Sequence, residues 1–401
     1  MVGTTLLNLL GPVLAFVVTV VVIVNVRPLA VAYGLVDMPD SRKRHQGQIP
    51  LIGGLAIFAG STVAMTVQYA LLGRPNLGTV DLTALLLASA LLVAIGVWDD
   101  FSDLPAFVRL LAQCAAVLAM IYGGHVVLLD LGHLVPGGER LALGAMAVPF
   151  TVFGCIGVIN AVNMIDGLDG LSGSLTLISL LGLGVANALW GHVGNQHLIV
   201  IIAACVSAFL LFNLRTLWRD RAWVFLGDAG SMFLGLTLCW LTISMSQGAT
   251  RVISPAVALW FLMLPIYDAV SMMLRRVLKG RSPFSADREH LHHIFVLAGF
   301  SVAETVTLMS GIAVVGVVIG LLGAYFVVPD WVLAALFLAG GAAYFWTIRR
   351  AWRVMRFMRR SICRRSRVAD RRTAAATDYT GPERRSGHER RLTSARPRVH
   401  H

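Results

Sequence analysis

Aspartate and asparagine side chains gather in three short segments at the ends of long apolar stretches of this chain. These segments contain the pair Asp99 and Asp100, the stretch over residues 160–169, and Asp228. A carboxylate at membrane depth costs roughly 2.5–3.5 kcal/mol on insertion scales. Several carboxylates near one membrane face therefore indicate a functional use, and oxygen ligands of this kind suit a hard divalent cation.

The stretch over residues 160–169 has the most specific pattern, because Asn160, Asn163, Asp166 and Asp169 recur every three residues. That spacing places successive side chains on neighbouring parts of one helical surface. An Asp-Gly pair alone usually marks a turn. Four Asn and Asp residues at period three predict a ligand-binding surface in addition to a turn, and we call this set the Asn/Asp ladder.

Asp99 and Asp100 follow an apolar stretch directly. Adjacent side chains on a helix point about 100° apart, so the two carboxylates cannot both bind one ion from a regular helix. We therefore expect different roles for them, while a simple stop signal at the membrane interface is the alternative. Asp103, two residues before Pro105, is predicted to cap the next helix.

Asp228 is flanked by Gly227 and Gly230, whose small size lets a phosphate or metal approach the backbone where a helix begins. A loop cap is the alternative for this segment. Asp268 lies inside an apolar stretch after Pro265. It is predicted to contact substrate, with a role in helix packing as the alternative.

A basic segment with three histidines follows residue 280. It contains Arg281, Arg288, His290, His292 and His293. Zinc is one ligand that such residues bind, but no cysteine lies nearby and one short loop rarely supplies a whole zinc site. Contact with an anionic or sugar ligand is the preferred interpretation.

The composition is that of a membrane protein, because 57% of residues are hydrophobic, only 13% are charged, and mean hydropathy is +0.76. Soluble domains carry about 25% charged residues. Since a spanning helix needs about 20 mostly apolar residues, the sequence predicts an all-α polytopic integral membrane protein with about eleven transmembrane helices. These cover residues 5–26, 50–72, 82–98, 105–122, 145–162, 171–190, 197–214, 230–247, 254–275, 303–327 and 331–348.

The basic residues predict the orientation, because Lys and Arg concentrate in cytoplasmic loops. With the N-terminus outside and the C-terminus cytoplasmic, only Arg74, Arg140 and Arg251 fall in outside loops. All three acidic segments then face the cytoplasm. The first five residues carry no Lys or Arg, which favours a retained first span over a cleaved signal.

The chain is predicted to have two parts, a transmembrane domain over 1–348 and a basic, disordered cytoplasmic tail over 349–401. The tail supplies most of the net charge of +12. This charge predicts contact with anionic membrane lipid, with a cytoplasmic partner protein as the alternative, and it does not indicate nucleic-acid binding. The five scattered cysteines predict neither a disulfide framework nor a thiolate zinc site.

Together these motifs resemble the polyprenyl-phosphate N-acetylhexosamine-1-phosphate transferases, most closely the bacterial type that transfers N-acetylglucosamine 1-phosphate to undecaprenyl phosphate. The resemblance covers about residues 5–350 and rests on five motifs in the family's order. The motifs are a segment with Asp37, Asp40, Arg42, Lys43 and His45 followed by Pro50-Leu-Ile-Gly53-Gly54, the pair Asp99-Asp100, the Asn/Asp ladder, Phe225-Leu-Gly-Asp228, and His290-Leu-His292-His293.

The resemblance implies a multi-pass protein of the bacterial cytoplasmic membrane with its active site on the cytoplasmic face. It implies dependence on Mg²⁺, with Mn²⁺ as the alternative, and a reaction of UDP-N-acetylglucosamine with undecaprenyl phosphate that initiates a cell-surface polysaccharide. The implied metal ligands are Asp228, Asp99 and Asp100. The implied catalytic residues are Asp99, Asp100, Asp166, Asp169, His290, His292 and His293. The implied substrate-binding residues are Asp37, Asp40, Arg42, Lys43, His45, Asn160, Asn163, Asp268, Arg281 and Arg288.

Several alternatives stay open at this point. Within the same class, the donor could be another UDP-N-acetylhexosamine, while the His-Leu-His-His loop disfavours a muramyl-pentapeptide transferase. A cation-coupled transporter would also place carboxylates in a membrane, but near its midplane on broken helices. A catalytically inactive anchor that displays the tail is disfavoured by the complete motif set. The sequence leaves a homodimer open.

Overall fold

The computed structural model describes residues 2–37, 48–72, 82–191, 193–216, 219–249, 251–280 and 290–350. Several predicted substrate-binding residues lie outside these ranges, as does the tail from residue 351. They are Asp40, Arg42, Lys43, His45, Arg281 and Arg288.

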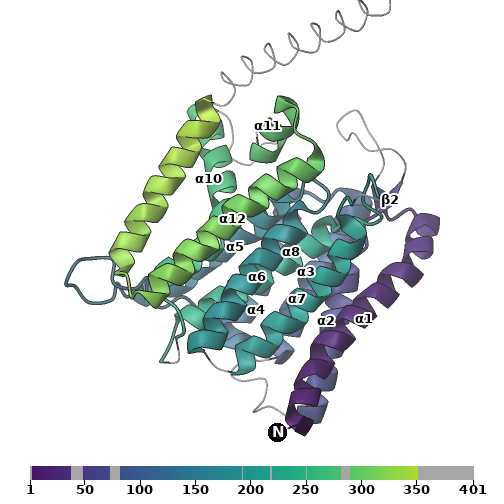
Figure 1. The fold of residues 1–401 in the computed structure, drawn as a ribbon, viewed down its shortest axis with the longest axis horizontal. Coiled ribbons are helices and arrows are strands. Elements are labelled where there is room, and N and C mark those ends of the chain that lie inside the picture. Colours follow the sequence, from purple (N-terminus) through teal and green to yellow (C-terminus); the bar gives the residue numbers. More distant parts are fainter. Residues whose placement is uncertain are drawn as a thin grey trace, which may run out of the picture. The chain divides into compact units, whose positions relative to one another are not determined.

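Helices dominate the described residues, as the sequence predicts (Figure 1). Ten of them are long and apolar enough to cross a membrane, or eleven if one bent pair counts as a span, which confirms a polytopic membrane protein. The helices are α1 (Val2–Tyr33), α2 (Gly53–Leu72), α3 (Leu82–Ser102), α4 (Ala106–Gly124), α5 (Ala147–Ile165), α6 (Leu171–Trp190), α7 (Val193–Asn213), α8 (Gly227–Ser246), α9 (Pro255–Phe261), α10 (Met263–Leu278), α11 (Leu291–Ala298) and α12 (Val302–Tyr325). A last helix, unlabelled in Figure 1, covers Asp330–Arg350.

The segment predicted as one span over 254–275 is a bent pair, because α9 and α10 meet at an angle of 83°. Pro265 explains the break, since proline lacks an amide donor and its ring clashes with the carbonyl four residues earlier. That carbonyl belongs to Phe261, and it accepts a hydrogen bond from the Ser179 hydroxyl at 2.6 Å instead. This hydrogen bond satisfies the Phe261 carbonyl, which water cannot reach within a membrane.

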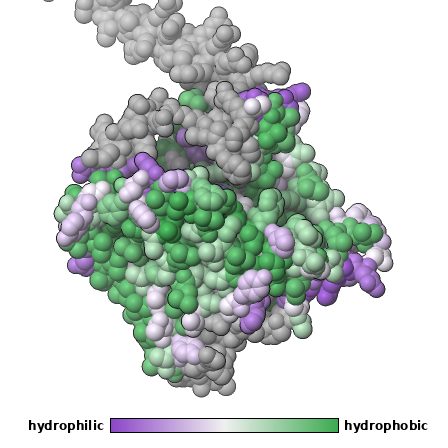
Figure 2. All heavy atoms as spheres, turned by 180° about the vertical axis from the view of Figure 1, so that it is seen from behind, coloured by the Kyte–Doolittle hydropathy of each residue, from purple (hydrophilic) through white to green (hydrophobic). Residues whose placement is uncertain are grey.

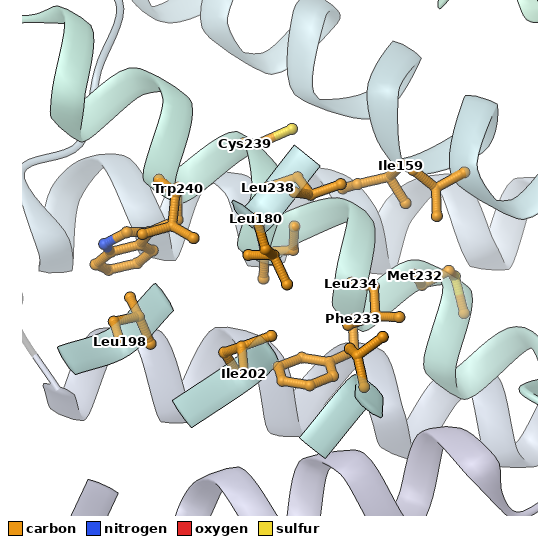
Figure 3. Close-up of a cluster of buried hydrophobic side chains, with 14 of the residues drawn as sticks. Ile159, Leu180, Leu198, Ile202, Met232, Phe233, Leu234, Leu238, Cys239 and Trp240 are labelled. Atoms are coloured by element: carbon orange, nitrogen blue, oxygen red, sulfur yellow. The ribbon is translucent and has the colours of Figure 1, made fainter. Parts of the chain in front are cut away.

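Helix α8 occupies the centre of the bundle. Its apolar side chains pack on those of α5, α6 and α7, as Figure 3 shows for Phe233, Leu238 and Trp240. A helix that is apolar all round belongs in a core. A Cβ at Gly96 of α3 would overlap the backbone of Ala229, so α3 and α8 are in close backbone contact. The first turn of α8 is therefore held firmly against its neighbours.

The outer surface of the bundle is apolar. Figure 2 shows a face made mostly of hydrophobic residues, with hydrophilic residues toward its margins. Large side chains such as those of Leu87, Phe107 and Phe153 are exposed at the surface of the described residues. Monomeric soluble proteins rarely expose contiguous apolar patches larger than a few hundred Å². The surface therefore fits contact with lipid chains.

Two short strands lie at the end of the bundle where α2 begins (Figure 1). β1 (Val36–Asp37) pairs antiparallel with β2 (Ile49–Pro50). The Pro50 carbonyl accepts a hydrogen bond from the Phe225 amide at 2.9 Å, and the Phe225 carbonyl accepts one from the Gly53 amide at 2.9 Å. These bonds place the strands next to the residues that precede α8.

Candidate active site

The three acidic segments meet at the first turn of α8. The Asp228 amide donates a hydrogen bond to Oδ1 of Asp100 at 3.0 Å. The Asn163 side chain donates to Oδ1 of Asp228 at 2.7 Å and to the Ser231 hydroxyl at 2.9 Å. Side chains from α3, α5 and α8, which are far apart in the sequence, are thereby joined in one polar cluster at one end of an apolar bundle.

Asp99 and Asp100 face different partners, as the geometry of a helix predicts. Asp99 is 5% exposed; its Oδ2 accepts a hydrogen bond from Arg109 at 2.7 Å and its Oδ1 accepts one from the Leu104 amide at 2.6 Å. Asp100 faces α8 instead. Its Oδ2 is buried and has no hydrogen-bond partner among the described residues. An unpaired buried carboxylate oxygen is costly and indicates a position for a bound cation.

Gly227 makes room for this carboxylate. Its φ of +72° is one that side chains rarely adopt, and a Cβ there would overlap Asp100. Glycine populates positive φ readily. The Gly-Asp sequence thus serves two needs, because the glycine admits the Asp100 carboxylate and the next residue brings Asp228 beside it.

Asp103 does not cap α4, so that prediction is wrong. The helix begins after Pro105 without a side-chain cap, and Asp103 has a φ of 46°. The carboxylate that binds the loop amide, at Leu104, belongs to Asp99 in the preceding helix. The connection between α3 and α4 is short, so Asp99 in the last turn of α3 reaches the loop. Asp99 therefore accepts a hydrogen bond there, whereas the sequence predicts Asp103 as the acceptor.

Arg109 of α4 is a site residue that the motif analysis missed. Its Nη1 donates to Oδ2 of Asp99 at 2.7 Å and to Oδ2 of Asp228 at 3.3 Å. It joins a carboxylate of α3 to one of α8. A sequence signal existed, because Arg109 is the only Lys or Arg between Arg74 and Arg140, and an isolated cation in an apolar helix needs a partner.

The side chains of the Asn/Asp ladder lie in different environments. Asn163 lies in the polar cluster, whereas Asn160 donates hydrogen bonds to Gln113 of α4 at 2.9 Å and to the Ile156 carbonyl. Asp169 accepts hydrogen bonds from Arg215 Nε at 2.7 Å and from the Ala222 amide at 3.0 Å. Since α5 ends at Ile165, the three-residue period does not keep Asp169 on the helical face of Asn160 and Asn163.

Asp166 follows the last residue of α5 and interacts electrostatically with carboxylates of the polar cluster. Burial, together with the negative charges of Asp228, Asp100 and Asp169, raises the pKa of Asp166 to about 8. Carboxylates near one another resist ionisation together. A bound cation would reverse this effect, so Asp166 marks a place where positive charge is favourable.

The histidine segment forms the start of α11. Neither ring nitrogen of His292 has a hydrogen-bond partner among the described residues, and burial lowers the pKa of His292 to about 3, with the neighbouring His293 adding to the effect. The His292 and His293 ring centroids are 4.2 Å apart. A Cβ at Gly167 would overlap the His292 ring, so the segment lies directly against the turn that follows Asp166.

Two further predicted residues are buried in neighbouring elements. Asp37 is buried in β1, next to the strand that contacts Phe225. Asp268 lies in α10, where its Oδ2 is 2.8 Å from His290 Nδ1. The structure therefore brings Asp99, Asp100, Asn163, Asp166 and Asp228 together, and it connects the histidines to them through Gly167.

The chain is similar to known proteins of one family. Residues 82–246 match the family model for glycosyl transferase family 4, a range that contains Asp99, Arg109, the ladder and Asp228. Proteins named undecaprenyl-phosphate alpha-N-acetylglucosaminyl 1-phosphate transferase are similar over most of the chain. The relative from Haemophilus influenzae is 37% identical, covering 86% of this chain and 95% of the relative. Those from Yersinia pestis and Shigella flexneri are each 36% identical, covering 83% and 86% of this chain and 89% and 92% of the relative.

Proposed function

The chain belongs to glycosyl transferase family 4, among the undecaprenyl-phosphate N-acetylglucosaminyl 1-phosphate transferases, and on this premise we propose that it transfers N-acetylglucosamine 1-phosphate from UDP-N-acetylglucosamine to undecaprenyl phosphate. An oxygen of the lipid phosphate attacks the phosphorus that carries the sugar. The bond from that phosphorus to the oxygen of the departing UMP breaks. The product is a lipid-linked diphospho-sugar that initiates a cell-surface polysaccharide.

The observation that supports this reaction best is the position of the polar cluster. Asp99, Asp100, Arg109, Asn163 and Asp228 meet at one end of a bundle whose sides are apolar. A lipid phosphate reaches such a place from the membrane, and a nucleotide sugar reaches it from water. We assign this end to the cytoplasmic face of the bacterial cytoplasmic membrane, because the loops there contain most of the basic residues of the core.

The donor atoms fit a magnesium ion. Mg²⁺ is usually bound by one or two carboxylates together with substrate phosphates, not by a cage of protein ligands. No group of three His, Cys, Asp or Glu side chains suited to a metal occurs in the part of the chain that the structure describes. Asp228 and the unpaired Oδ2 of Asp100 are the proposed ligands. When bound, Mg²⁺ would offset the charge of the phosphates during transfer.

Asp99 has a different proposed role. Both of its oxygens accept hydrogen bonds, from Arg109 and from the Leu104 amide, and it is therefore poorly placed to take a proton from a substrate. The reaction has little need of a base, because a phosphomonoester has a second pKa near 6 and is largely dianionic at neutral pH. We assign Asp99 to holding Arg109, whose charge then faces Asp228 and the incoming phosphates.

The donor nucleotide sugar is assigned to the other side of the cluster. Asp166, the turn at Gly167 and the histidines of α11 lie against one another there. His292 is neutral at physiological pH, since its pKa is about 3. It therefore offers one hydrogen-bond donor and one acceptor, which suits the hydroxyl and amide groups of a sugar or base.

The experiment that tests this function measures UMP release by the purified protein with undecaprenyl phosphate and a panel of UDP-sugars. UDP-N-acetylglucosamine should be the best donor, and the lipid product should contain the sugar phosphate. Asp228→Asn should remove most turnover and leave the protein folded in the membrane. Release of UMP with a different UDP-N-acetylhexosamine only would reassign the donor. Absence of UMP release with every donor would overturn the function.

A further inference from the structure

Asp268 is a buried carboxylate whose two oxygens are both bound by the protein. It is 1% exposed. Oδ2 lies 2.8 Å from His290 Nδ1, and Oδ1 accepts hydrogen bonds from the Leu291 amide at 3.1 Å and from the Tyr344 hydroxyl at 2.9 Å. The role in substrate binding that the sequence suggests does not fit this burial. The carboxylate instead acts on other residues of the protein.

The first of these residues is His290. An ionised carboxylate only accepts hydrogen bonds, so the contact with Asp268 requires a hydrogen on Nδ1 of the histidine. In the neutral ring, Nε2 is then the nitrogen that holds the lone pair. The His290 ring is also stacked on that of His292, with centroids 5.3 Å apart and an interplanar angle of 10°. Both the tautomer and the plane of the ring are thus determined.

The second contact fixes the helix that presents the histidines. The Leu291 amide belongs to the first residue of α11, and His290 is the residue before that helix. The first amides of a helix have no partner within it, and a negative charge beside them is favourable. The same carboxylate of Asp268 therefore holds the first amide of α11 and orients the His290 ring.

The third contact comes from the last helix, over Asp330–Arg350. Tyr344 donates its hydroxyl to Asp268 from this helix. This hydrogen bond holds the carboxylate in the orientation that both His290 and Leu291 need. The last helix lies outside the residues matched by the family model, yet it supports a side chain near the donor side of the site.

We propose that Asp268 and Tyr344 are positioning residues that hold the His290 ring, with its hydrogen on Nδ1, for contact with the donor nucleotide sugar. This proposal rests on the proposed function and adds two residues to its machinery. Neither residue touches substrate. Their effect on turnover passes through His290.

Two conservative variants test the proposal, with a third as a matched control. Asp268→Asn removes the carboxylate with little change in shape, and Tyr344→Phe removes a single hydroxyl. Tyr267→Phe is the control, because Tyr267 is buried and donates its hydroxyl to the Phe337 carbonyl of the last helix and not to Asp268, while its ring packs against that of Tyr344. Partners that orient a metal-ligating histidine typically contribute about 10–100-fold, and we take this as the scale for an oriented substrate-binding histidine. Asp268→Asn should lower kcat/KM by about that factor and Tyr344→Phe by less, while Tyr267→Phe stays within about twofold.

A double-mutant cycle separates positioning from general damage. If Asp268 and Tyr344 act through His290, then adding Asp268→Asn or Tyr344→Phe to His290→Ala should cost almost nothing further. Losses that multiply in the double variants would overturn the proposal. The same cycle is also built from dissociation constants of UDP-N-acetylglucosamine measured by calorimetry. These constants can be determined even where His290→Ala turns over too slowly for a kinetic assay.

A spectroscopic measurement does not depend on activity at all. Nitrogen NMR of histidine-labelled protein, with the His290 signals assigned by their loss in His290→Ala, should show a hydrogen on Nδ1 in the wild type. Asp268→Asn should change those signals, whereas Tyr267→Phe should not. A bare Nδ1 in the wild type would overturn the proposal. A wild type that shows the expected tautomer but releases no UMP would instead overturn the proposed function.

Discussion

Arg109 is the residue whose replacement tests the geometry of the cluster most directly. Its guanidinium lies between Asp99 of α3 and Asp228 of α8, with both hydrogen bonds made by the same Nη1 atom. Arg109→Gln keeps a polar side chain but removes the charge. Arg109→Lys keeps the charge in a more compact form, which can still reach one carboxylate.

The size of the effect follows from burial. Breaking a buried ion pair by removing one partner costs about 3–5 kcal/mol, whereas an exposed pair contributes about 0–1 kcal/mol. The Asp99 side chain is 4% exposed, but those of Arg109 and Asp228 are 34% and 31% exposed, so solvent screens part of the interaction. The contacts of Arg109 are therefore worth about 2 kcal/mol, and if the transition state uses all of this energy, Arg109→Gln lowers kcat/KM roughly 30-fold.

The assay is steady-state UMP release with each substrate varied in turn, and thermal melting in detergent checks folding. Arg109→Gln should lower kcat/KM for undecaprenyl phosphate by about that 30-fold, with Arg109→Lys between it and the wild type. Arg140→Gln is the control, since Arg140 lies in the connection between α4 and α5, outside the cluster. Wild-type kcat/KM in Arg109→Gln would refute the role of this contact in catalysis.

Four further predictions concern the site, the stability of the fold, the topology and the tail. Because Asp166 has a pKa of about 8, a cation that binds beside it must displace a proton, so Mg²⁺ affinity measured by titration should rise with pH up to about 8; a pH-independent affinity would exclude Asp166 from the cation's surroundings. Asp169→Ala frees both Arg215 and the Ala222 amide, and it should lower stability in a thermal melt by about 1–2 kcal/mol, more than Arg215→Ala does. Reporter fusions after Gly248 and in the tail should lie on opposite sides of the membrane, and a tail found outside would contradict the predicted topology. A chain ending at residue 358 should keep its kcat in detergent. A collapse of kcat without loss of folding would contradict the predicted lipid-binding role of the tail.

The sequence predicted the spans well, because length and apolar content determine whether a helix can cross a membrane. It also predicted that Asp99 and Asp100 separate, since the turn of a helix points adjacent side chains apart. Apolar content alone predicts one span over residues 254–275, although Pro265 lies inside it. At the 83° bend the Ser179 hydroxyl donates a hydrogen bond to the Phe261 carbonyl, and this contact joins residues far apart in the chain.

The site was less predictable where contacts depend on how helices pack. Nothing in the local sequence joins Arg109 to Asp228 or Tyr344 to Asp268, because these pairs lie 119 and 76 residues apart. The period of the ladder predicted a shared surface, but the helix ends at Ile165, and Asp169 binds Arg215 instead. Local periodicity predicts a face only as long as the element that generates it continues.

The charge balance of the cluster explains why its parts depend on one another. Asp99, Asp100 and Asp228 lie within a network of direct hydrogen bonds, and Arg109 is the cation that the structure shows in contact with two of them. Both proposed substrates are anions as well. Without further positive charge, each phosphate would meet net repulsion at a site of reduced dielectric constant, where Coulomb energies are larger than in water. The charges of the described residues therefore favour a divalent cation at this cluster, and we propose that it binds at Asp100, whose buried Oδ2 has no hydrogen-bond partner among those residues.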